Sequence, residues 1–232
     1  MTHRTWFWLL LSLFLLWAVA LGIAPLYRAD WMLENVLTVV VVILLLSTSK
    51  ALPLSRWSYT LVFIFLFLHE VGSHYTYAEV PYDQWWRAAF GYSLNEALGF
   101  ERNHFDRLVH FLHGLLLAYP LRELLSRVVA VNGFWRYFLT LNLIMSSAML
   151  YELVEWLAAE AFGGELGMAY LGTQGDVWDA HKDMLLATLG ALLAMGITAG
   201  LNLWWQHSFA SEWRESLRVK HAASLGVKTE DE

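Results

Sequence analysis

The sequence contains no cysteine, so disulfide bridges and thiolate metal sites are excluded. Charged residues are also scarce, at 16% of the 232 residues against about a quarter in a typical soluble domain. Acidic residues outnumber basic ones and give a net charge of -6, which argues against nucleic acid as a partner. In place of charge, 58% of the residues are hydrophobic, and they occur in long runs. This combination is typical of an integral membrane protein.

Six segments of the chain come close to the roughly 20 mostly apolar residues that a helix needs to cross a bilayer. The first segment also resembles a cleavable signal peptide, with Ala18-Val19-Ala20 as the cleavage site. We predict an all-α, polytopic transmembrane bundle of about six spans at 1–207, an interfacial outer loop at 78–103 and a polar cytoplasmic tail at 208–232. The predicted spans are 6–26, 31–47, 57–77, 104–120, 135–162 and 177–204.

Basic residues are shared unevenly between the two sides of this bundle: ten lie on the side of the termini and five on the other. Cytoplasmic segments of membrane proteins carry an excess of Lys and Arg, so both termini are predicted to be cytoplasmic. Of the 21 acidic residues, 15 lie on the opposite side or in the span ends that face it. The outer end is therefore expected to be acidic and to attract cations.

The polar residues inside the spans gather at four span ends that face outward together. Charges inside a span cost about 2.5–3.5 kcal/mol each on insertion scales and are usually functional. The orientation rests on loop Lys and Arg, whereas the cluster consists of acids and histidines, so the two observations are independent. The residues are His69, Glu70 and His74 in the third span, His104, Asp106, His110 and His113 in the fourth, Glu152 and Glu155 in the fifth, and Asp176, Asp179, His181 and Asp183 in the sixth.

Helical spacing places several of these side chains on common faces. Asp106, His110 and His113 lie within about 60° of one another. Helices that offer Asp, Glu and His inward can build a metal site, and this donor set suits zinc, manganese or iron. We predict a divalent metal ion as cofactor. The predicted metal ligands are His74, Asp106, His110, Glu152, Asp179 and Asp183, and the predicted catalytic residues are Glu155, as general base, His113 and His181.

Each of these residues has a simpler alternative role as an interfacial cap or a salt-bridge partner, as in Asp106 with Arg107 or Asp179 with Lys182. The segment from His69 to His74 resembles the zinc-protease motif H-E-x-x-H but is one residue too long, which separates the two histidines by about 140° around a helix. The aromatic outer loop at 78–103 fits an interfacial helix that serves as a lid, as a lipid-entry element or as a surface anchor.

Four motifs of polar and aromatic residues lie at the span ends. They are His69-Glu70 with His74-Tyr75-Thr76-Tyr77, Asn103-His104-Phe105-Asp106-Arg107 with His110, Tyr151-Glu152 with Glu155-Trp156, and the run from Gly172 to Met184. Together they resemble the YjdF-type family of bacterial inner-membrane proteins over most of the chain. The resemblance implies a compact multi-pass helical protein of the bacterial inner membrane, whose acidic end would face the periplasm. It supplies no catalytic residues.

Three classes of function remain open from the sequence. The first is a metal-dependent enzyme of the hydrolase type that acts on a lipid or lipid-linked substrate from the outer leaflet. The second is a cation or proton-coupled transporter or binding protein, although the cytoplasmic halves of the spans carry almost no charge. The third is a membrane assembly partner without catalysis. In all three cases the protein is expected to lie in a lipid bilayer.

Overall fold

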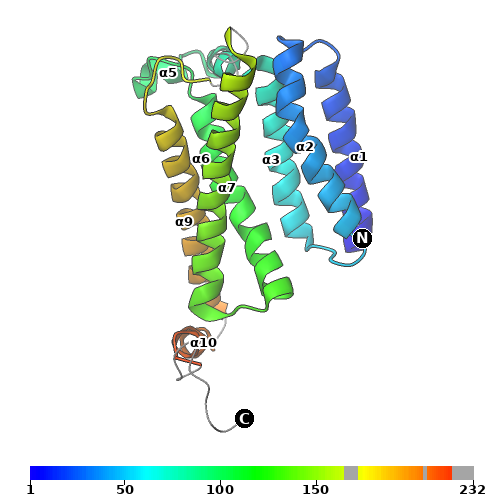
Figure 1. Ribbon diagram of the computed structural model, residues 1–232, viewed down its shortest axis with the longest axis vertical. Coiled ribbons are helices and arrows are strands. Elements are labelled where there is room, and N and C mark those ends of the chain that lie inside the picture. Colours follow the sequence, from blue (N-terminus) through cyan, green and yellow to red (C-terminus); the bar gives the residue numbers. More distant parts are fainter. Residues whose placement is uncertain (165–171, 206–207, 221–232) are drawn as a thin grey trace.

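Six long helices stand side by side in the computed structural model, which describes residues 1–164, 172–205 and 208–220 (Figure 1). These ranges contain helices, turns and loops but no strand, which confirms the all-α prediction. One long helix corresponds to each predicted span. The long helices are α1 (His3–Gly22), α2 (Arg28–Thr48), α3 (Arg56–Tyr75), α6 (Phe105–Leu124), α7 (Gly133–Phe162) and α9 (Asp179–Trp205).

Local sequence signals set several helix boundaries. Thr2 and Ser55 cap α1 and α3 with hydroxyl oxygens that accept hydrogen bonds from backbone N–H groups in the first turn. α3 ends where Thr76 and Tyr77 adopt left-handed backbone angles, with φ of 55° and 39°. Non-glycine residues rarely adopt such angles, so surrounding contacts have to hold this corner in place.

Four of the long helices, α1, α2, α7 and α9, are long and apolar enough to cross a membrane. Large apolar side chains on their surfaces are exposed, such as Leu16 at 69% and Leu150 at 57%. Such surfaces are favourable against lipid chains rather than water, so the chain is an integral membrane protein. α3 and α6 are 20 residues long each and carry more polar residues. The number of spans, six, and the cytoplasmic location of both termini stay predictions.

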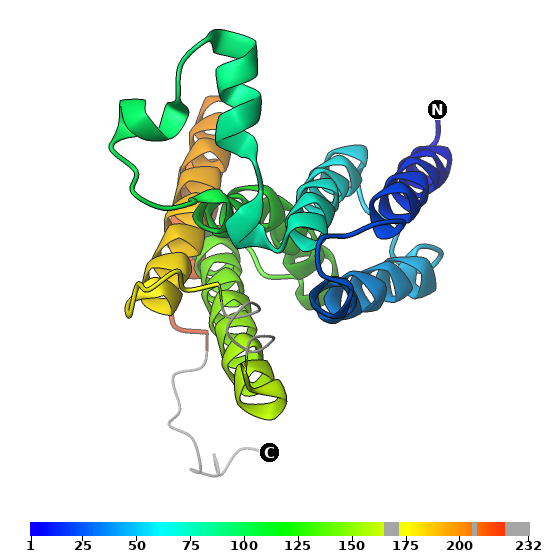
Figure 2. The same ribbon diagram turned by 90° about the horizontal axis from the view of Figure 1, so that it is seen from above.

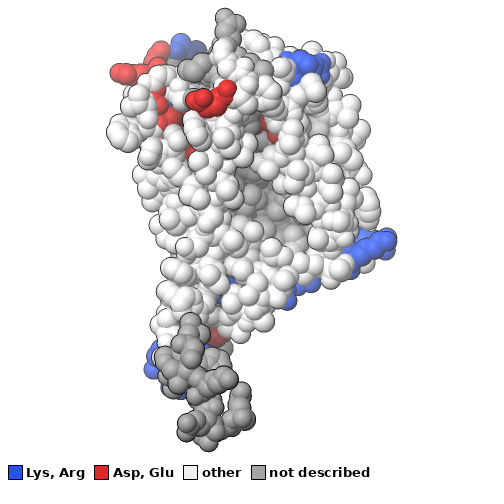
Figure 3. Space-filling view, viewed as in Figure 1, with Lys and Arg blue, Asp and Glu red and all other residues white. Residues whose placement is uncertain are grey.

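Charged side chains avoid the middle of the bundle. On the face in Figure 3, Asp and Glu gather toward the upper end, Lys and Arg occur near both ends, and a broad band between them carries neither. The N-terminus and α10 (Phe209–Ser216) lie at the lower end (Figure 1). There Phe209 of α10 packs against Tyr137 near the start of α7 and against Trp213 of its own helix. The predicted division into bundle, outer loop and tail remains untested, and residues 221–232 of the tail lie outside the described part.

Short helices follow α3 at the upper end: η1 (Tyr77–Glu79), α4 (Tyr82–Phe90) and α5 (Leu94–Leu98). Seen from above, α4 and α5 are displaced toward the side of α9 and away from α1 and α2 (Figure 2). Asp83 ties the two together by accepting hydrogen bonds from Ser93 Oγ and Asn95 N, and the backbone N–H of Asn95 lowers the pKa of this carboxyl. Trp85 and Phe90 are exposed, and the interfacial placement of this loop and its roles as lid, lipid-entry element or anchor stay predictions.

α6 and α9 approach each other closely because glycine lies at their crossing. A Cβ atom added to Gly190 would overlap the carbonyl oxygen of Phe111, and one added to Gly114 would overlap that of Ala187. Small residues continue along the same interface, where Ala187, Ala191 and Ala118 are fully buried. Small side chains let helix backbones pack closely within a membrane. This crossing fixes how Asp106 and His110 on α6 stand relative to Asp183 on α9.

Candidate functional site

Three side chains from the two crossing helices converge near the upper end of the bundle. Asp106 and His110 are one turn apart on α6, and Asp183 lies in the second turn of α9. Each offers a ligand atom, and these atoms all lie within 4.8 Å of one another. His110 and Asp183 are almost completely buried. The described residues contain no other group of three or more such side chains with this geometry.

Glu152 on α7 lies beside this group. His110 Nε2 lies 3.5 Å from both Asp106 Oδ1 and Glu152 Oε1, too far for a good hydrogen bond. Ligand atoms that share one ion at bonds of 2.0–2.2 Å stand about 3.0–3.5 Å apart, so these spacings suit a common ion. Glu152 Oε1 and Asp183 Oδ1 are buried without a hydrogen-bond partner among the described residues. We call Asp106, His110, Glu152 and Asp183 the central cluster.

Glu155 lies one turn beyond Glu152 on α7 and is also buried. It shares a hydrogen bond with Glu152 and lies within electrostatic range of Asp106 and Asp183. The residue predicted as general base therefore adjoins the central cluster. Several carboxylates in so small a volume repel one another unless protons or a cation neutralise them.

Two carboxylates from α2 were missed in the sequence. Glu34 is buried, accepts a hydrogen bond from Tyr151 OH at 3.1 Å and interacts electrostatically with Asp106 and His110. Asp30, one turn earlier, accepts a hydrogen bond from the Thr76 hydroxyl. The i, i+4 spacing of the two acids at the outer start of a span was the available signal. The acidic site is therefore built from four helices: α2, α6, α7 and α9.

α3 contributes a buried hydrogen-bonded pair beside α2. His69 Nε2 donates to the backbone oxygen of Glu34 at 3.3 Å, which leaves Nδ1 to accept a hydrogen bond from the Tyr77 hydroxyl. The left-handed corner at Thr76 and Tyr77 thus places one hydroxyl on Asp30 and the other on His69. These contacts hold the end of α3 against α2.

The Tyr77→Phe substitution is expected to lower the free energy of unfolding by about 1–3 kcal/mol, because it leaves buried His69 Nδ1 without a donor. Thermal unfolding of the purified protein in detergent measures this change. The matched control is Tyr92→Phe, since Tyr92 is 49% exposed and its substitution should stay within about 0.5 kcal/mol. Equal melting temperatures for both variants would contradict the hydrogen bond.

Asp179, a predicted ligand, lies in an ion-pair group above the central cluster. Arg102 Nη1 is 2.8 Å and Arg107 Nη2 is 3.3 Å from Asp179 Oδ1, and Arg107 also pairs with Asp176. Lys182 Nζ donates to Asp176 at 2.6 Å, and this hydrogen bond is the main reason that the pKa of Asp176 is lowered. We call Arg102, Arg107, Asp176, Asp179 and Lys182 the outer ion-pair group.

The three remaining predicted histidines stand apart from the central cluster. His74 Nδ1 donates to the backbone oxygen of Leu21 at 2.8 Å, at the junction of α1 and α2. His113 Nε2 lies 3.2 Å from Ser147 Oγ, about one turn deeper than His110. His181 is exposed, with its ring edge against Trp178. Of the nine predicted site residues, the structure brings together Asp106, His110, Glu152, Glu155 and Asp183.

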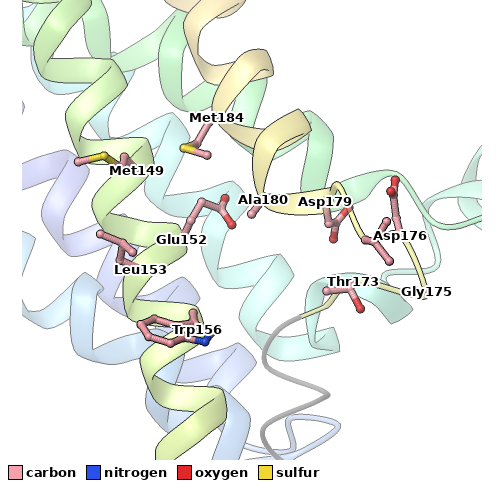
Figure 4. Close-up of a pocket in the computed structure, with 11 residues that line it drawn as sticks. Met149, Glu152, Leu153, Trp156, Thr173, Gly175, Asp176, Asp179, Ala180 and Met184 are labelled. Carbon is pink, nitrogen blue, oxygen red and sulfur yellow. The ribbon is translucent and has the colours of Figure 1, made fainter.

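A cleft of about 490 Å³ opens between α7 and α9 and reaches Glu152. Its walls include Met149, Leu153, Trp156 and Met184. In Figure 4 the Glu152 carboxylate points from α7 toward Ala180 on α9, and Asp176 and Asp179 lie at the far end of the same cleft. The cleft therefore joins an apolar flank of the bundle to the central cluster.

Comparison with known proteins places this architecture in a family. The family profile described as "Predicted membrane protein (DUF2238)" matches residues 6–202. The chain belongs to the DUF2238 family. It is also 40% identical over 172 residues to the Escherichia coli (strain K12) inner membrane protein YjdF, covering 74% of this chain and 78% of that protein. This confirms the YjdF-type resemblance. No solved structure matches the chain.

Proposed function

We propose that this DUF2238 member is a metal-dependent hydrolase of the bacterial inner membrane that acts on a lipid or lipid-linked substrate at its outer, periplasmic side. The observation that carries the proposal is the meeting of Asp106, His110 and Asp183 within 4.8 Å at the crossing of α6 and α9. A buried Asp183 oxygen without a partner gives independent support, because a buried carboxylate without a neutralising group is strongly unfavourable.

The residues divide into distinct roles under this proposal. Asp106, His110 and Asp183 hold the ion, and Glu152 completes a mixed oxygen and nitrogen set that suits zinc, manganese or iron. A divalent ion at this place would lower the pKa of a bound water and polarise a carbonyl or phosphoryl oxygen. Glu155, next to Glu152, would accept the proton of that water. Asp179 acts by positioning Arg102 and Arg107 rather than as a ligand.

Elemental analysis of the purified protein tests the metal site. We expect about one divalent ion per chain in the native protein, its removal by a chelator and its return on addition of zinc, manganese or iron. Hydrolysis of inner-membrane lipid extract in proteoliposomes is expected to follow metal content. Absence of stoichiometric metal from protein purified in metal-supplemented buffer would overturn the proposal.

One observation favours a second candidate, a cation or proton-coupled transporter. Glu70 on α3 is fully buried, and no basic side chain within the described ranges pairs with its carboxyl. The side chains of Thr38 and Asn35 on α2 lie beside this carboxyl. Unpaired acids inside a bundle are common in proton relays. Cation flux into vesicles that is lost in the Asp183→Asn variant, without any hydrolysis, would support transport.

A further inference from the structure

The cleft between α7 and α9 opens toward the hydrocarbon of the membrane. Leu150, Val154 and Leu157 on α7 are each more than half exposed beside it, and on α9 Leu185 is exposed to a similar degree. Both helices are candidate membrane spans, so these side chains face lipid chains. A molecule that fills the outer part of the cleft must therefore be apolar.

The inner part of the cleft has the opposite character. Its lining includes the carboxylates of Glu152, Asp176 and Asp179, and Glu152 Oε1 lies 3.5 Å from His110 Nε2. One ligand can satisfy both parts only if it is apolar at one end and polar at the other. This requirement describes a lipid that lies with its chain between α7 and α9 and its head group at the central cluster.

The charges around the head-group position indicate its chemistry. Arg102 and Arg107 pair with Asp179 in the cleft lining, yet Arg102 Nη2 and Arg107 Nε are buried without a hydrogen-bond partner among the described residues. These free N–H groups suit the oxygens of a phosphate. The four acids Asp106, Glu152, Glu155 and Asp183 lie close together at the inner end of the cleft, with His110 among them. They repel an anion unless a divalent ion stands between the acids and the phosphate.

We infer that the substrate is a phosphate-bearing lipid that enters sideways from the bilayer through the α7–α9 cleft, and that the divalent cation binds first. This inference rests on the metal site proposed above. The hydrolytic step breaks one ester bond at the phosphate: water adds its hydroxyl to phosphorus, and the departing lipid oxygen takes up a proton. The guanidinium groups and the ion hold the phosphate from opposite sides, and the cleft holds the chain.

Photo-crosslinking in proteoliposomes tests the inference. The probes are a phosphatidic acid analogue with a photoactivatable acyl chain and a methylene group in place of the hydrolysable ester oxygen, and a diacylglycerol with the same chains and no phosphate. With manganese, we expect the phosphatidic acid probe to label the peptides that carry Leu153, Trp156 and Met184, about tenfold or more above its level with a chelator, a usual size for coupling between two ligands. The diacylglycerol probe should label weakly in both conditions.

Two variants fill the cleft, Ala180→Trp from α9 and Leu153→Trp from α7, and each is expected to lower labelling about tenfold. Leu150→Trp is the matched control, since it adds the same side chain to an exposed position outside the cleft lining and should label like the native protein. Melting temperature and bound manganese are measured on each variant. The labelling of a cleft-filling variant is interpreted only if its melting temperature and its bound manganese equal those of the native protein. One such variant is enough for the test.

The outcomes separate the two proposals. A native protein that binds no manganese overturns the metal site and the hydrolase with it. A protein that binds manganese but is labelled equally with and without chelator, or equally by diacylglycerol, overturns the phosphate-bearing lipid and leaves the metal site standing. If a folded cleft-filling variant is labelled as strongly as the native protein, the lipid does not enter through the cleft.

Discussion

Gly190→Ala is expected to destabilise the protein by about 3 kcal/mol or more, although it adds a single methyl group. The new Cβ would overlap the carbonyl oxygen of Phe111 and lie 2.8 Å from the backbone nitrogen of Leu115. Backbone atoms cannot rotate away as a side chain can, so α6 and α9 must separate. Separation also moves Asp183 away from Asp106 and His110, and metal affinity should fall together with the melting temperature.

Gly196→Ala on the same helix provides the control for this experiment. A Cβ at Gly196 meets nothing within 4 Å, so the substitution is expected to be neutral or to stabilise by about 0.4–1 kcal/mol, because alanine restricts the unfolded chain. Thermal unfolding in one detergent compares the two. If both variants melt at or above the native temperature, the helices do not cross at Gly190 as described.

Asp183→Asn is expected to lower metal affinity about 100-fold or more, since loss of an outer hydrogen-bond partner of a metal ligand alone commonly costs 10–100-fold. Asp183 supplies the only ligand from α9 in the group with Asp106 and His110. Asparagine retains the shape of the aspartate side chain, and it removes one buried negative charge from a group of closely spaced carboxylates. The folded protein should therefore keep or raise its melting temperature without metal while it loses the ion.

Isothermal titration with manganese or zinc measures that affinity. Glu101→Gln serves as control, because it removes a negative charge from an exposed position at the same end of the bundle. A general effect of acidic charge would weaken binding equally in both variants. Native affinity in Asp183→Asn would remove this residue from the site and with it the main observation behind the proposed function.

The helices could be predicted because bilayer thickness sets a length that apolar runs must reach, and each predicted span has its helix. The part of the site on α6 could be predicted because Asp106 and His110 are neighbours one turn apart. Asp183 and Glu152 could be predicted as site residues because the orientation of the spans in the membrane brings their outer ends to one surface. Within one helix or one end of the bundle, local geometry was sufficient.

Contacts between distant segments could not be predicted in the same way. The i, i+4 rule places Asp179 with Asp183, but Arg102 from the outer loop pairs with Asp179 across 77 positions of sequence. His113 shares a face with His110 and yet meets Ser147 of α7. The predicted second span, 31–47, contains Glu34 but excludes Asp30, whereas α2 begins at Arg28 and carries both acids in its first two turns, so their i, i+4 spacing was not apparent.

The placement of the central cluster on helices far apart in the chain has a consequence for biosynthesis. Asp106 and His110 belong to α6 and Glu152 to α7, while Asp183 arrives with α9, the last of the long helices described. Chains emerge and insert from the N-terminus. During synthesis Asp106 and Glu152 therefore enter the membrane before Asp183 has been made. Under the proposed function, the ion would therefore bind only after α9 has been made.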